Sequence, residues 1–392
     1  MNAPAWLSDA ALQQFFAAVQ QAGGEARAVG GSVRDFLLGA PGGDVDLAAT
    51  LEPPAVMALA KAQGWKAIPT GIDHGTVTVV LPSRVVEVTT LRRDVATDGR
   101  HAKVAYTDRW EEDAARRDFT INALYMDAGG NIHDYFGGQK DLKARTVRFI
   151  GDAGRRIEED GLRILRYFRF LAVLGWSTEK AALAACGERR QMLAVLSGER
   201  IQQEMKKLLA ARDPSAVLGA MAQLELPALL TESPWDVSPV AALVGYEREQ
   251  LLAGDPWVRL LAMIDADVRL DTALWTGERW KLSRAERQAL AVLAAPAAAL
   301  DPAAVKESLR KHPRPLVTGR ILLAALDSDE EMAIDALLRL AQDWEIPQFP
   351  VTAKDLLKLG MKEGPELGRK LKALEQRWVE SDYRLGRDQL LT

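Results

Sequence analysis

The chain has 392 residues, of which 48% are hydrophobic and 27% charged, and its formal net charge is −4. This composition is typical of a globular protein long enough for two to four compact units. A single cysteine, Cys186, excludes an intramolecular disulfide framework, and four histidines without cysteine partners give no zinc-ligand spacing. No export signal or membrane-spanning run is visible, so we expect a cytoplasmic protein without membrane contact.

The first part of the chain combines helices with short strands. Apolar residues at helical spacing predict an N-terminal helix after Ser8, and a second helical pattern covers residues 53–63. Runs of β-branched residues predict four strands, at 26–29, 45–49, 76–81 and 85–91. Together they predict an α+β head domain with a small mixed or antiparallel sheet over residues 1–149.

Strand patterns nearly vanish after this point, and alanine, leucine, arginine and glutamate dominate. We expect an all-α remainder with a neck at 150–210, a body at 211–345 and a tail at 346–392. Residues 140–210 carry 15 Lys and Arg against 9 Asp and Glu. A basic segment in an otherwise acidic chain suits a polyanionic ligand, although a solvated helical face explains it equally well.

Two aspartates, Asp44 and Asp46, lie two residues apart at a predicted strand, so their side chains share one face of it. Such a pair is tolerable once a divalent cation lies between the carboxylates, and Mg²⁺ prefers hard oxygen ligands. Gly30 and Gly31 precede this strand and lack a Cβ, which lets their backbone approach a triphosphate closely. An ordinary glycine turn beside a structural Asp-x-Asp is the alternative.

A third acid interrupts the apolar strand at 85–91. Glu87 projects from the face opposite Val86 and Val88, which is an expensive place for a lone charge. If this strand neighbours the one with the two aspartates, Glu87 completes a carboxylate triad. It would then accept the proton of an attacking hydroxyl or help to hold the ion. The alternative is an edge-strand glutamate that faces solvent.

The next two segments are polar. Residues 92–109 lack periodicity, which predicts a loop and suggests a lid over a bound nucleotide. Arg116, Arg117, Asp118 and Asn122 follow, and arginine forks match phosphate oxygens while Asp and Asn accept a sugar hydroxyl. These four residues therefore suit a nucleotide triphosphate and its ribose. The alternative is an ion pair at a helix end.

Residues 158–170 predict a helix with an apolar stripe that includes Leu165 and Phe168. On this helix Asp160 and Arg163 are surface neighbours, an acceptor beside a fork of donors. Such a pair complements cytosine and adenine and opposes uracil and guanine, which can be worth a factor on the order of 10⁴ in discrimination. The alternative is an ordinary ion pair between residues three apart.

Six segments in this order resemble class II CCA-adding enzymes, the tRNA nucleotidyltransferases with a polymerase-β-like head. The segments are GGSVRD with DVD, VEVTTLR, RRDFTINAL, HDYFGGQKDL, EEDGLRILRYFRF and GERIQQEMKKLL. The resemblance is close over about residues 25–210 and loose beyond them.

The resemblance implies roles for these residues. Asp44 and Asp46 would bind metal, with two Mg²⁺ ions expected, and Glu87 would be the third catalytic carboxylate. Asp160 and Arg163 would act as an amino-acid template for CTP and then ATP, and Glu199, Arg200 and Glu204 would brace a neck helix turn. The expected nucleotide-binding residues are Gly30, Gly31, Arg34, Arg117, Asp118, Asn122, Asp160, Arg163 and Arg166.

The implied reaction is addition of C-C-A to the 3′ end of tRNA from CTP and ATP, with release of pyrophosphate. A bacterial poly(A) polymerase or an A-only adding enzyme is the alternative within this class. An RNA-binding protein with an inactive transferase head is the alternative outside it. The sequence leaves open the oligomeric state, the switch from C to A, and the choice between Mg²⁺ and Mn²⁺.

Overall fold

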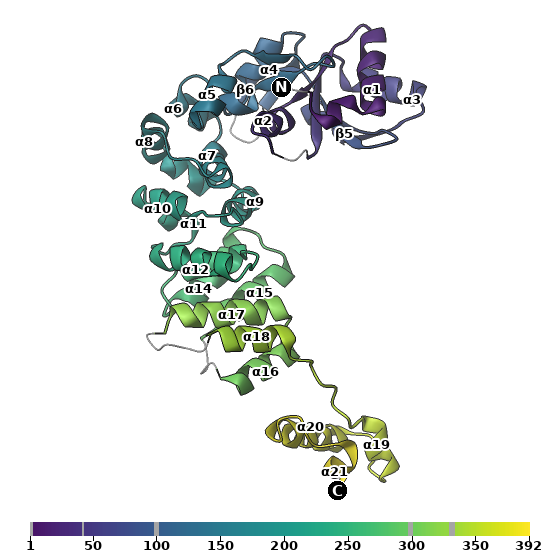
Figure 1. The fold of residues 1–392 in the computed structure, drawn as a ribbon, viewed down its shortest axis with the longest axis vertical. Helices are drawn as coiled ribbons and strands as arrows, with labels where there is room; N and C mark the ends of the chain where they lie inside the picture. Colours follow the sequence, from purple (N-terminus) through teal and green to yellow (C-terminus); the bar gives the residue numbers. More distant parts are fainter. Residues whose placement is uncertain (1–2, 41–42, 98–101, 297–300, 329–333) are drawn as a thin grey trace. The chain divides into compact units, whose positions relative to one another are not determined.

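The computed structural model describes residues 3–40, 43–97, 102–296, 301–328 and 334–392. The chain divides into two compact units. The first consists of Met1–Pro256 with Trp275–Ser283, and the second of Trp257–Leu274 with Arg284–Thr392. All strands of the described chain lie in the purple-to-blue part of Figure 1, before residue 135. The boundaries expected at residues 149, 210 and 345 stay predictions.

A seven-stranded sheet forms the head of the first unit. In spatial order its strands are β3 (Lys66–Gly71), β4 (Thr76–Val80), β5 (Val85–Thr90), β2 (Val45–Ala49), β1 (Ala26–Val29), β8 (Leu124–Met126) and β9 (Ile132–Asp134). The pair β2–β5 is parallel, and the other neighbours are antiparallel. The four predicted strands are confirmed. The sequence did not predict β3, β8 and β9, because the last two span three residues each and β3 carries Pro69 at a sheet edge.

Helices and single turns surround this sheet. They are η1 (Ala5–Ser8), α1 (Ala10–Gln21), α2 (Gly31–Leu37), α3 (Pro53–Ala62), η2 (Ile72–His74), α4 (Trp110–Ala115), η3 (Thr120–Asn122) and α5 (Gly138–Ala144). The predicted N-terminal helix is confirmed as α1. The Asp9 carboxylate caps it by accepting the N–H of Leu12 at 2.9 Å, and Leu12 and Phe15 are fully buried.

The segment expected to be an irregular loop forms a hairpin instead. β6 (Arg92–Thr97) pairs antiparallel with β7 (Ala102–Tyr106) in a separate two-stranded sheet. The loop prediction for residues 92–109 is therefore wrong for these two strands, and residues 98–101 lie outside the described part of the chain. Main-chain hydrogen bonds close a hairpin ladder without an apolar face, so the absence of apolar periodicity did not exclude strands.

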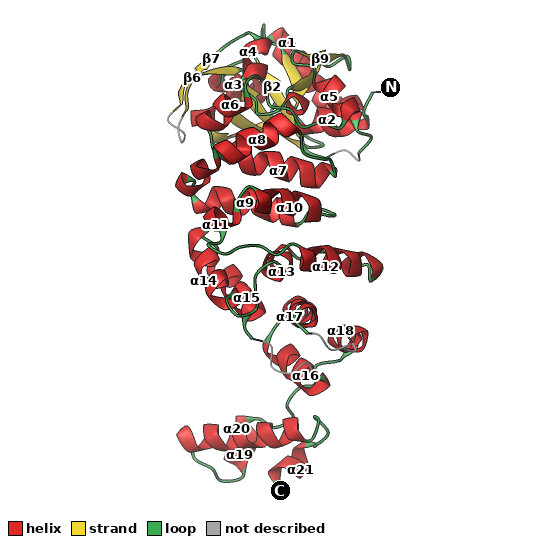
Figure 2. Cartoon of the chain, turned by 90° about the vertical axis from the view of Figure 1, so that its left-hand side faces the viewer, coloured by secondary structure: helices red, strands yellow, loops and turns green. Residues whose placement is uncertain are grey.

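The first unit continues as helices. They are α6 (Ala153–Glu159), α7 (Leu162–Leu174), α8 (Lys180–Glu188), η4 (Arg190–Val195), α9 (Gly198–Leu209), α10 (Ser215–Gln223), α11 (Pro227–Leu230) and α12 (Ser238–Glu249). Figure 2 shows α7 next to the head, followed by α9 and α10. Aromatic rings join α7 to the head: Phe170 meets Phe119 edge to face at 5.5 Å, and Tyr167 stacks on Phe149 at 5.7 Å.

The last part of the chain is also helical, as predicted. Its helices are α13 (Pro256–Ala262), α14 (Arg269–Arg279), α15 (Arg284–Ala294), α16 (Pro302–Lys311), α17 (Arg314–Leu326), α18 (Ile334–Asp343), α19 (Ala353–Lys358), α20 (Pro365–Glu380) and α21 (Arg387–Leu391). One apolar cluster includes Val305 and Ile321 of α16 and α17, and another includes Leu356 and Trp378 of α19 and α20. None of the helices in the described residues combines the length and apolar content of a membrane span.

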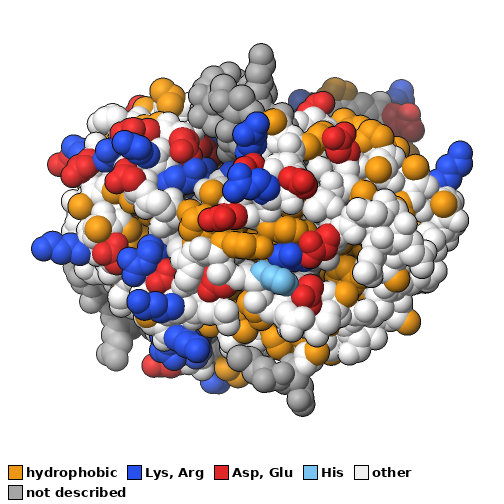
Figure 3. Space-filling model, turned by 90° about the horizontal axis from the view of Figure 1, so that it is seen from above, with side chains coloured by type: hydrophobic (Ala, Val, Ile, Leu, Met, Phe, Trp, Pro, Cys, Tyr) orange, Lys and Arg blue, Asp and Glu red, His pale blue; other side chains and the backbone are white. Residues whose placement is uncertain are grey.

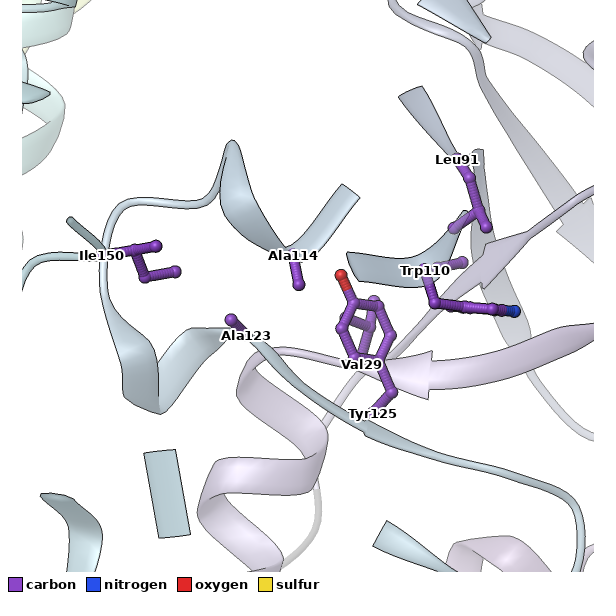
Figure 4. Packing of buried hydrophobic residues seen from close by; sticks show 8 residues of the cluster. Val29, Leu91, Trp110, Ala114, Ala123, Tyr125 and Ile150 are labelled. Carbon is purple, nitrogen blue, oxygen red and sulfur yellow. The ribbon is translucent and has the colours of Figure 1, made fainter. Parts of the chain in front are cut away.

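An apolar cluster in the head supports the elements that carry the candidate site. Figure 4 shows Tyr125 of β8 beside Val29 of β1 and Trp110 of α4, with its hydroxyl group on the side of Ala114. The Trp110 and Tyr125 rings meet edge to face at 5.3 Å, and Leu91 before the hairpin is fully buried in the same cluster. The cluster thus joins the sheet, α4 and the base of the hairpin in one packed core.

A close backbone contact also fixes α5 against η3. A Cβ on Gly138 would lie 2.3 Å from the Thr120 carbonyl oxygen, so only glycine fits. Gly138→Ala should therefore lower the free energy of unfolding by about 1–3 kcal/mol in urea denaturation, because overpacking forces the backbone apart. The matched control is Gly219→Ala in α10, where a Cβ meets nothing within 4 Å. This change should raise stability by about 0.5–1 kcal/mol, and equal effects of the two variants would contradict the contact.

Candidate active site

The predicted carboxylates meet on neighbouring strands. In the parallel pair β2–β5, Asp46 lies directly opposite Glu87 in the register. Val45, Leu47, Val86 and Val88 are buried on the other face, whereas Asp46 and Glu87 are exposed. The two carboxylates therefore project from the same side of the sheet, as predicted. Because β5 lies between β4 and β2, the alternative of an edge-strand glutamate is wrong.

Asp46 lies close to other negatively charged side chains and is repelled by them. The Asp46 side chain reaches solvent, but surrounding protein atoms remove part of its hydration, which raises its pKa. The negative charges of Glu87 and Asp44 raise the pKa further, against a smaller opposing effect of Arg117. Within the described residues, no three acidic, histidine or cysteine side chains stand close enough to form an assembled metal site. The donor set nevertheless fits a divalent cation, because its ligands are hard carboxylate oxygens and their mutual repulsion needs a positive partner.

The glycine pair lies at the start of α2. Gly30 has a φ of 71° and a ψ of −119°, a conformation that favours glycine. A Cβ there would lie 3.7 Å from Nη1 of Arg117. From the same turn, Arg34 donates through Nη1 to the Asn122 Oδ1 at 2.8 Å. The turn thus lies beside an arginine and an amide that were predicted to bind nucleotide.

Arg116 and Arg117 form the ion pairs named as the alternative, and their binding to a nucleotide stays a prediction. Asp113 of α4 forms ion pairs with Arg116 at 2.7 Å and with Arg117 at 3.1 Å, which is the helix-end pairing named as the alternative. Both arginines also line the pocket described below. Burial would raise the pKa of Asp113, but Arg117 and Arg116 together hold it at about 2.

A chain of buried polar contacts runs from this segment to α7. The Asp118 carboxylate accepts from its own neighbour, the Phe119 N–H, at 2.8 Å and from the Asn122 amide at 3.2 Å. Arg166 of α7 donates to Asp118 through Nε at 2.7 Å. Burial raises the pKa of Asp118, but the Arg166 charge and the Asn122 bond outweigh it and leave the pKa lowered. This carboxylate therefore stays ionised and can only accept hydrogen bonds.

The continuous helix predicted over residues 158–170 is wrong, and so is the alternative of an ion pair between Asp160 and Arg163. The helix breaks at Asp160, which caps the end of α6 with extended dihedrals, and α7 begins at Leu162. The Asp160 carboxylate accepts from Arg200 of α9 at 2.6 Å, whereas Arg163 donates to Glu159 at 2.6 Å. The break at Asp160 thus accompanies a different ion-pair partner for each side chain. Both still line the same pocket.

These groups enclose a cavity of about 640 Å³ between the sheet and α7. Every predicted site residue lines it except Asp44, which acts on Asp46 through its charge. Among the lining residues of the described chain, eight are arginines and four are acids. Figure 3 shows a different face, the upper end of Figure 1, where Lys and Arg alternate with Asp and Glu. The pocket is thus a concentrated positive field suited to phosphate groups.

Several residues that line the pocket were not predicted as nucleotide-binding residues. They include Thr76, Thr89, Arg92, Arg169, Phe170 and Arg200. Strand alternation could have found Thr89, which is two residues from Glu87 on the same face. The three-residue spacing of Arg163, Arg166 and Arg169 could have marked one face of α7 as basic. No residue spacing around Arg92 indicated that it would line the pocket.

Comparison with known proteins identifies the family. Residues 26–148 match the poly A polymerase head domain, and residues 177–232 match the probable RNA and SrmB-binding site of polymerase A. The mitochondrial CCA tRNA nucleotidyltransferase 1 of Danio rerio is 37% identical over 383 residues, which cover 94% of this chain and 86% of that protein. The chain belongs to the CCA-adding tRNA nucleotidyltransferases.

Bacterial members of the CCA-adding family are also similar. The CCA-adding enzyme of Geobacillus thermodenitrificans is 42% identical over 223 residues, covering 54% of this chain and 53% of that protein. The crystal structure of the Bacillus stearothermophilus CCA-adding enzyme in complex with CTP superposes with a TM-score of 0.75 at 28% identity, covering 95% and 93% of the two chains. The Thermotoga maritima CCA-adding enzyme complexed with tRNA-CCA shares the fold, with a TM-score of 0.66 at 20% identity over 96% and 92% of the chains.

The predicted CCA-adding family, fold class and enzyme class are therefore confirmed. The head domain match alone would not separate a poly(A) polymerase from a CCA-adding enzyme, since its description names the former. The relatives that span most of the chain make the separation, because they are named as CCA-adding enzymes. With an enzyme established, an RNA-binding protein with an inactive head no longer accounts for the chain.

Repulsion at Asp46 predicts a conflict between stability and activity. A raised pKa means that the ionised carboxylate costs stability, and the cost appears as pH rises through the folded-state pKa. Without metal at pH 7, Asp46→Asn should therefore unfold at a higher temperature than the wild type while losing nucleotide incorporation. The difference in unfolding temperature should vanish below about pH 3.8, where the unfolded-state carboxyl is also protonated.

Thermal unfolding with EDTA across pH 3–8 measures this effect. Asp73→Asn is the matched control, because Asp73 is exposed and lies outside the pocket. A lower unfolding temperature for Asp46→Asn at pH 7 would contradict the repulsion.

Proposed function

We propose that this pocket performs C-C-A addition to the 3′ end of tRNA. The tRNA 3′-hydroxyl oxygen forms a bond to the α-phosphorus of CTP twice and of ATP once, and the bond to the β-phosphate breaks each time to release pyrophosphate. One observation carries the proposal: Asp46 and Glu87 stand side by side in a pocket that also holds eight arginines. Carboxylates that can hold a cation, in one pocket with arginines that can bind phosphates, suit nucleotidyl transfer.

We assign Asp44, Asp46 and Glu87 to binding a divalent metal, with Mg²⁺ and two ions as the specific proposal. Divalent metal use is general among nucleotidyltransferases of this family. Such ions, when bound, stabilise negative charge on the attacking and leaving oxygens. Glu87 itself can accept the proton of the attacking hydroxyl, because it is an exposed carboxylate beside Asp46.

In this proposal the arginine, aspartate and amide groups bind the sugar and the phosphates of the nucleotide. Arg34 and Arg117 flank the Gly30–Gly31 turn, where the backbone admits a close phosphate. Asp118 remains ionised and is held by Asn122 and Arg166, so it accepts a ribose hydroxyl in a fixed orientation. Each group is held by a neighbour within the protein, which reduces the entropy lost when the nucleotide binds.

Asp160 and Arg163 are the proposed base-recognition pair, with Arg166 beside them. Their separate partners, Arg200 and Glu159, hold an acceptor and a fork of donors that both line the pocket. Cytosine and adenine present an amine donor next to a ring-nitrogen acceptor and so complement this pair. Uracil and guanine present the opposite order and are rejected.

The tRNA itself would be held by the helical part of the chain. Basic residues of the neck, such as Lys206 and Lys207 of α9, provide phosphate contacts without sequence readout. We place this function in the cytoplasm, with which the single free cysteine, the buried Cys186, is compatible. The Danio rerio relative is named as mitochondrial.

Single-nucleotide incorporation tests the function directly. On a tRNA that ends before CCA, we expect CTP alone to add two residues and ATP alone to add none. The CTP and ATP mixture should give a complete CCA end, read from the terminal sequence of the product, and EDTA should abolish all addition. ATP addition without prior CTP would instead indicate a poly(A) polymerase or an A-only enzyme.

Substitution of the base-recognition carboxylate tests the proposed selectivity. Asp160→Ala should keep the fold, by circular dichroism, but should lose most of the preference for CTP and ATP over UTP. The kcat/KM ratio of CTP to UTP should fall by at least about tenfold, because removal of a half-buried acceptor that lines the pocket relaxes discrimination. Glu188→Ala is the control, since Glu188 is an exposed acid at the end of α8 outside the pocket. Unchanged rejection of UTP by Asp160→Ala would refute the assignment.

A further inference from the structure

A buried carboxylate stands directly behind the arginines of the pocket without lining it. Asp113 of α4 is 1% exposed. Its Oδ1 accepts from Nε of Arg116 at 2.8 Å and from the backbone N–H of Arg92 at 3.3 Å. Its Oδ2 accepts from the Tyr125 hydroxyl at 2.8 Å and from Nη2 of Arg117 at 3.1 Å. One carboxylate thus joins two pocket arginines, a core tyrosine and the first residue of the hairpin.

These bonds fix the direction in which Arg117 points. Its Nε donates to the Tyr125 hydroxyl at 3.0 Å and its Nη2 donates to Asp113, so two of its three nitrogens are held from behind. The third, Nη1, lies on the side of the glycine turn, 3.7 Å from where a Cβ on Gly30 would stand. The planar fork is therefore presented to the place proposed for the nucleotide phosphates.

We propose that Asp113, together with Tyr125, is a positioning residue that aims Arg116 and Arg117 at the β- and γ-phosphates of the incoming nucleotide. The proposal rests on the proposed function of the pocket. An arginine that is already oriented loses little side-chain entropy when phosphate binds, so its full interaction strengthens binding. The same carboxylate also anchors Arg92, a third arginine of the pocket, through its main chain.

Asp113 and Tyr125 each keep one protonation state, so the support that they give the arginines does not change with pH. The Arg117 and Arg116 charges outweigh burial and hold the pKa of Asp113 at about 2, so it stays ionised at any pH at which the enzyme works. Burial raises the pKa of Tyr125, with the Asp113 charge also acting in that direction, so its hydroxyl keeps the proton that it donates to Asp113. A purely structural role would be met as well by an apolar pair of similar volume, because buried ion pairs add little net stability.

Kinetics of Asp113→Asn test the proposal, with CMP as a ligand that lacks the β- and γ-phosphates. We expect the KM for CTP to rise at least about tenfold, while the inhibition constant of CMP against CTP and the KM for tRNA stay within about twofold. Tyr125→Phe should change the same constants in the same direction by a smaller factor, because it removes the acceptor of Nε but keeps the ion pair. Glu112→Gln, an acid-to-amide change at the neighbouring position of α4, should change none of them; its carboxylate contacts Arg109 and Thr107 outside the pocket.

Equal weakening of CTP and CMP, or an equal rise in the KM for tRNA, would show a general loosening of the head and overturn the proposal. If Asp113→Asn fails to fold by circular dichroism, Tyr125→Phe decides by the same criterion. A wild-type enzyme that incorporates no CTP would instead refute the function proposed for the pocket. The two failures are thus distinguishable.

Discussion

The parallel pairing of β2 with β5 is the constraint on which the site depends. Neighbouring strands lie about 4.8 Å apart, so their in-register residues Asp46 and Glu87 must stand side by side. Buried Val45, Leu47, Val86 and Val88 hold the register, because a slip by one residue would bring the acids into the core. The sheet therefore accepts a repulsion that raises the pKa of Asp46, and a cation bound there would relieve it.

The pocket follows a second rule: most of its arginines have an acid behind or beside them. Asp113 holds Arg116 and Arg117, and Asp118 holds Arg166. Glu204 of α9 pairs with Arg169 in the same way. These acids keep like charges from driving the arginines apart, and they fix where each fork points. The result is a positive surface whose geometry is set before a nucleotide enters.

Much of this site could be predicted because its determinants are local in the chain. Three of its signals lie within a few residues of sequence: the two-residue spacing of Asp44 and Asp46, the lone acid Glu87, and the glycine pair. Because side chains alternate along a strand, this spacing also predicts which face of the sheet the acids occupy. The same holds for the apolar stripe of α7, whose Leu165 and Phe168 are fully buried. Local periodicity was sufficient for the fold class as well.

The features that the sequence did not predict depend on contacts between residues far apart in the chain. The helix break at Asp160 accompanies Gly161, where a Cβ would lie 2.8 Å from the Cβ of Met192, a neighbour 31 residues away. The partner of Asp160 is Arg200, forty residues along the chain. The positioning role of Asp113 could not be predicted, because a buried acid in a short helix has no periodic pattern of its own. The strand pair 92–97 and 102–106 was missed because its main-chain pairing is not encoded in a local sequence pattern.

The most direct test of the shared cation site is an anomalous difference map from crystals grown with Mn²⁺ and CTP. The account predicts a metal peak within about 2.0–2.3 Å of carboxylate oxygens from both Asp46 and Glu87, on the face of the sheet that turns toward α7. A metal peak bound to Asp46 without Glu87, or placed elsewhere in the pocket, would contradict the claim that the parallel strand pair builds the catalytic centre.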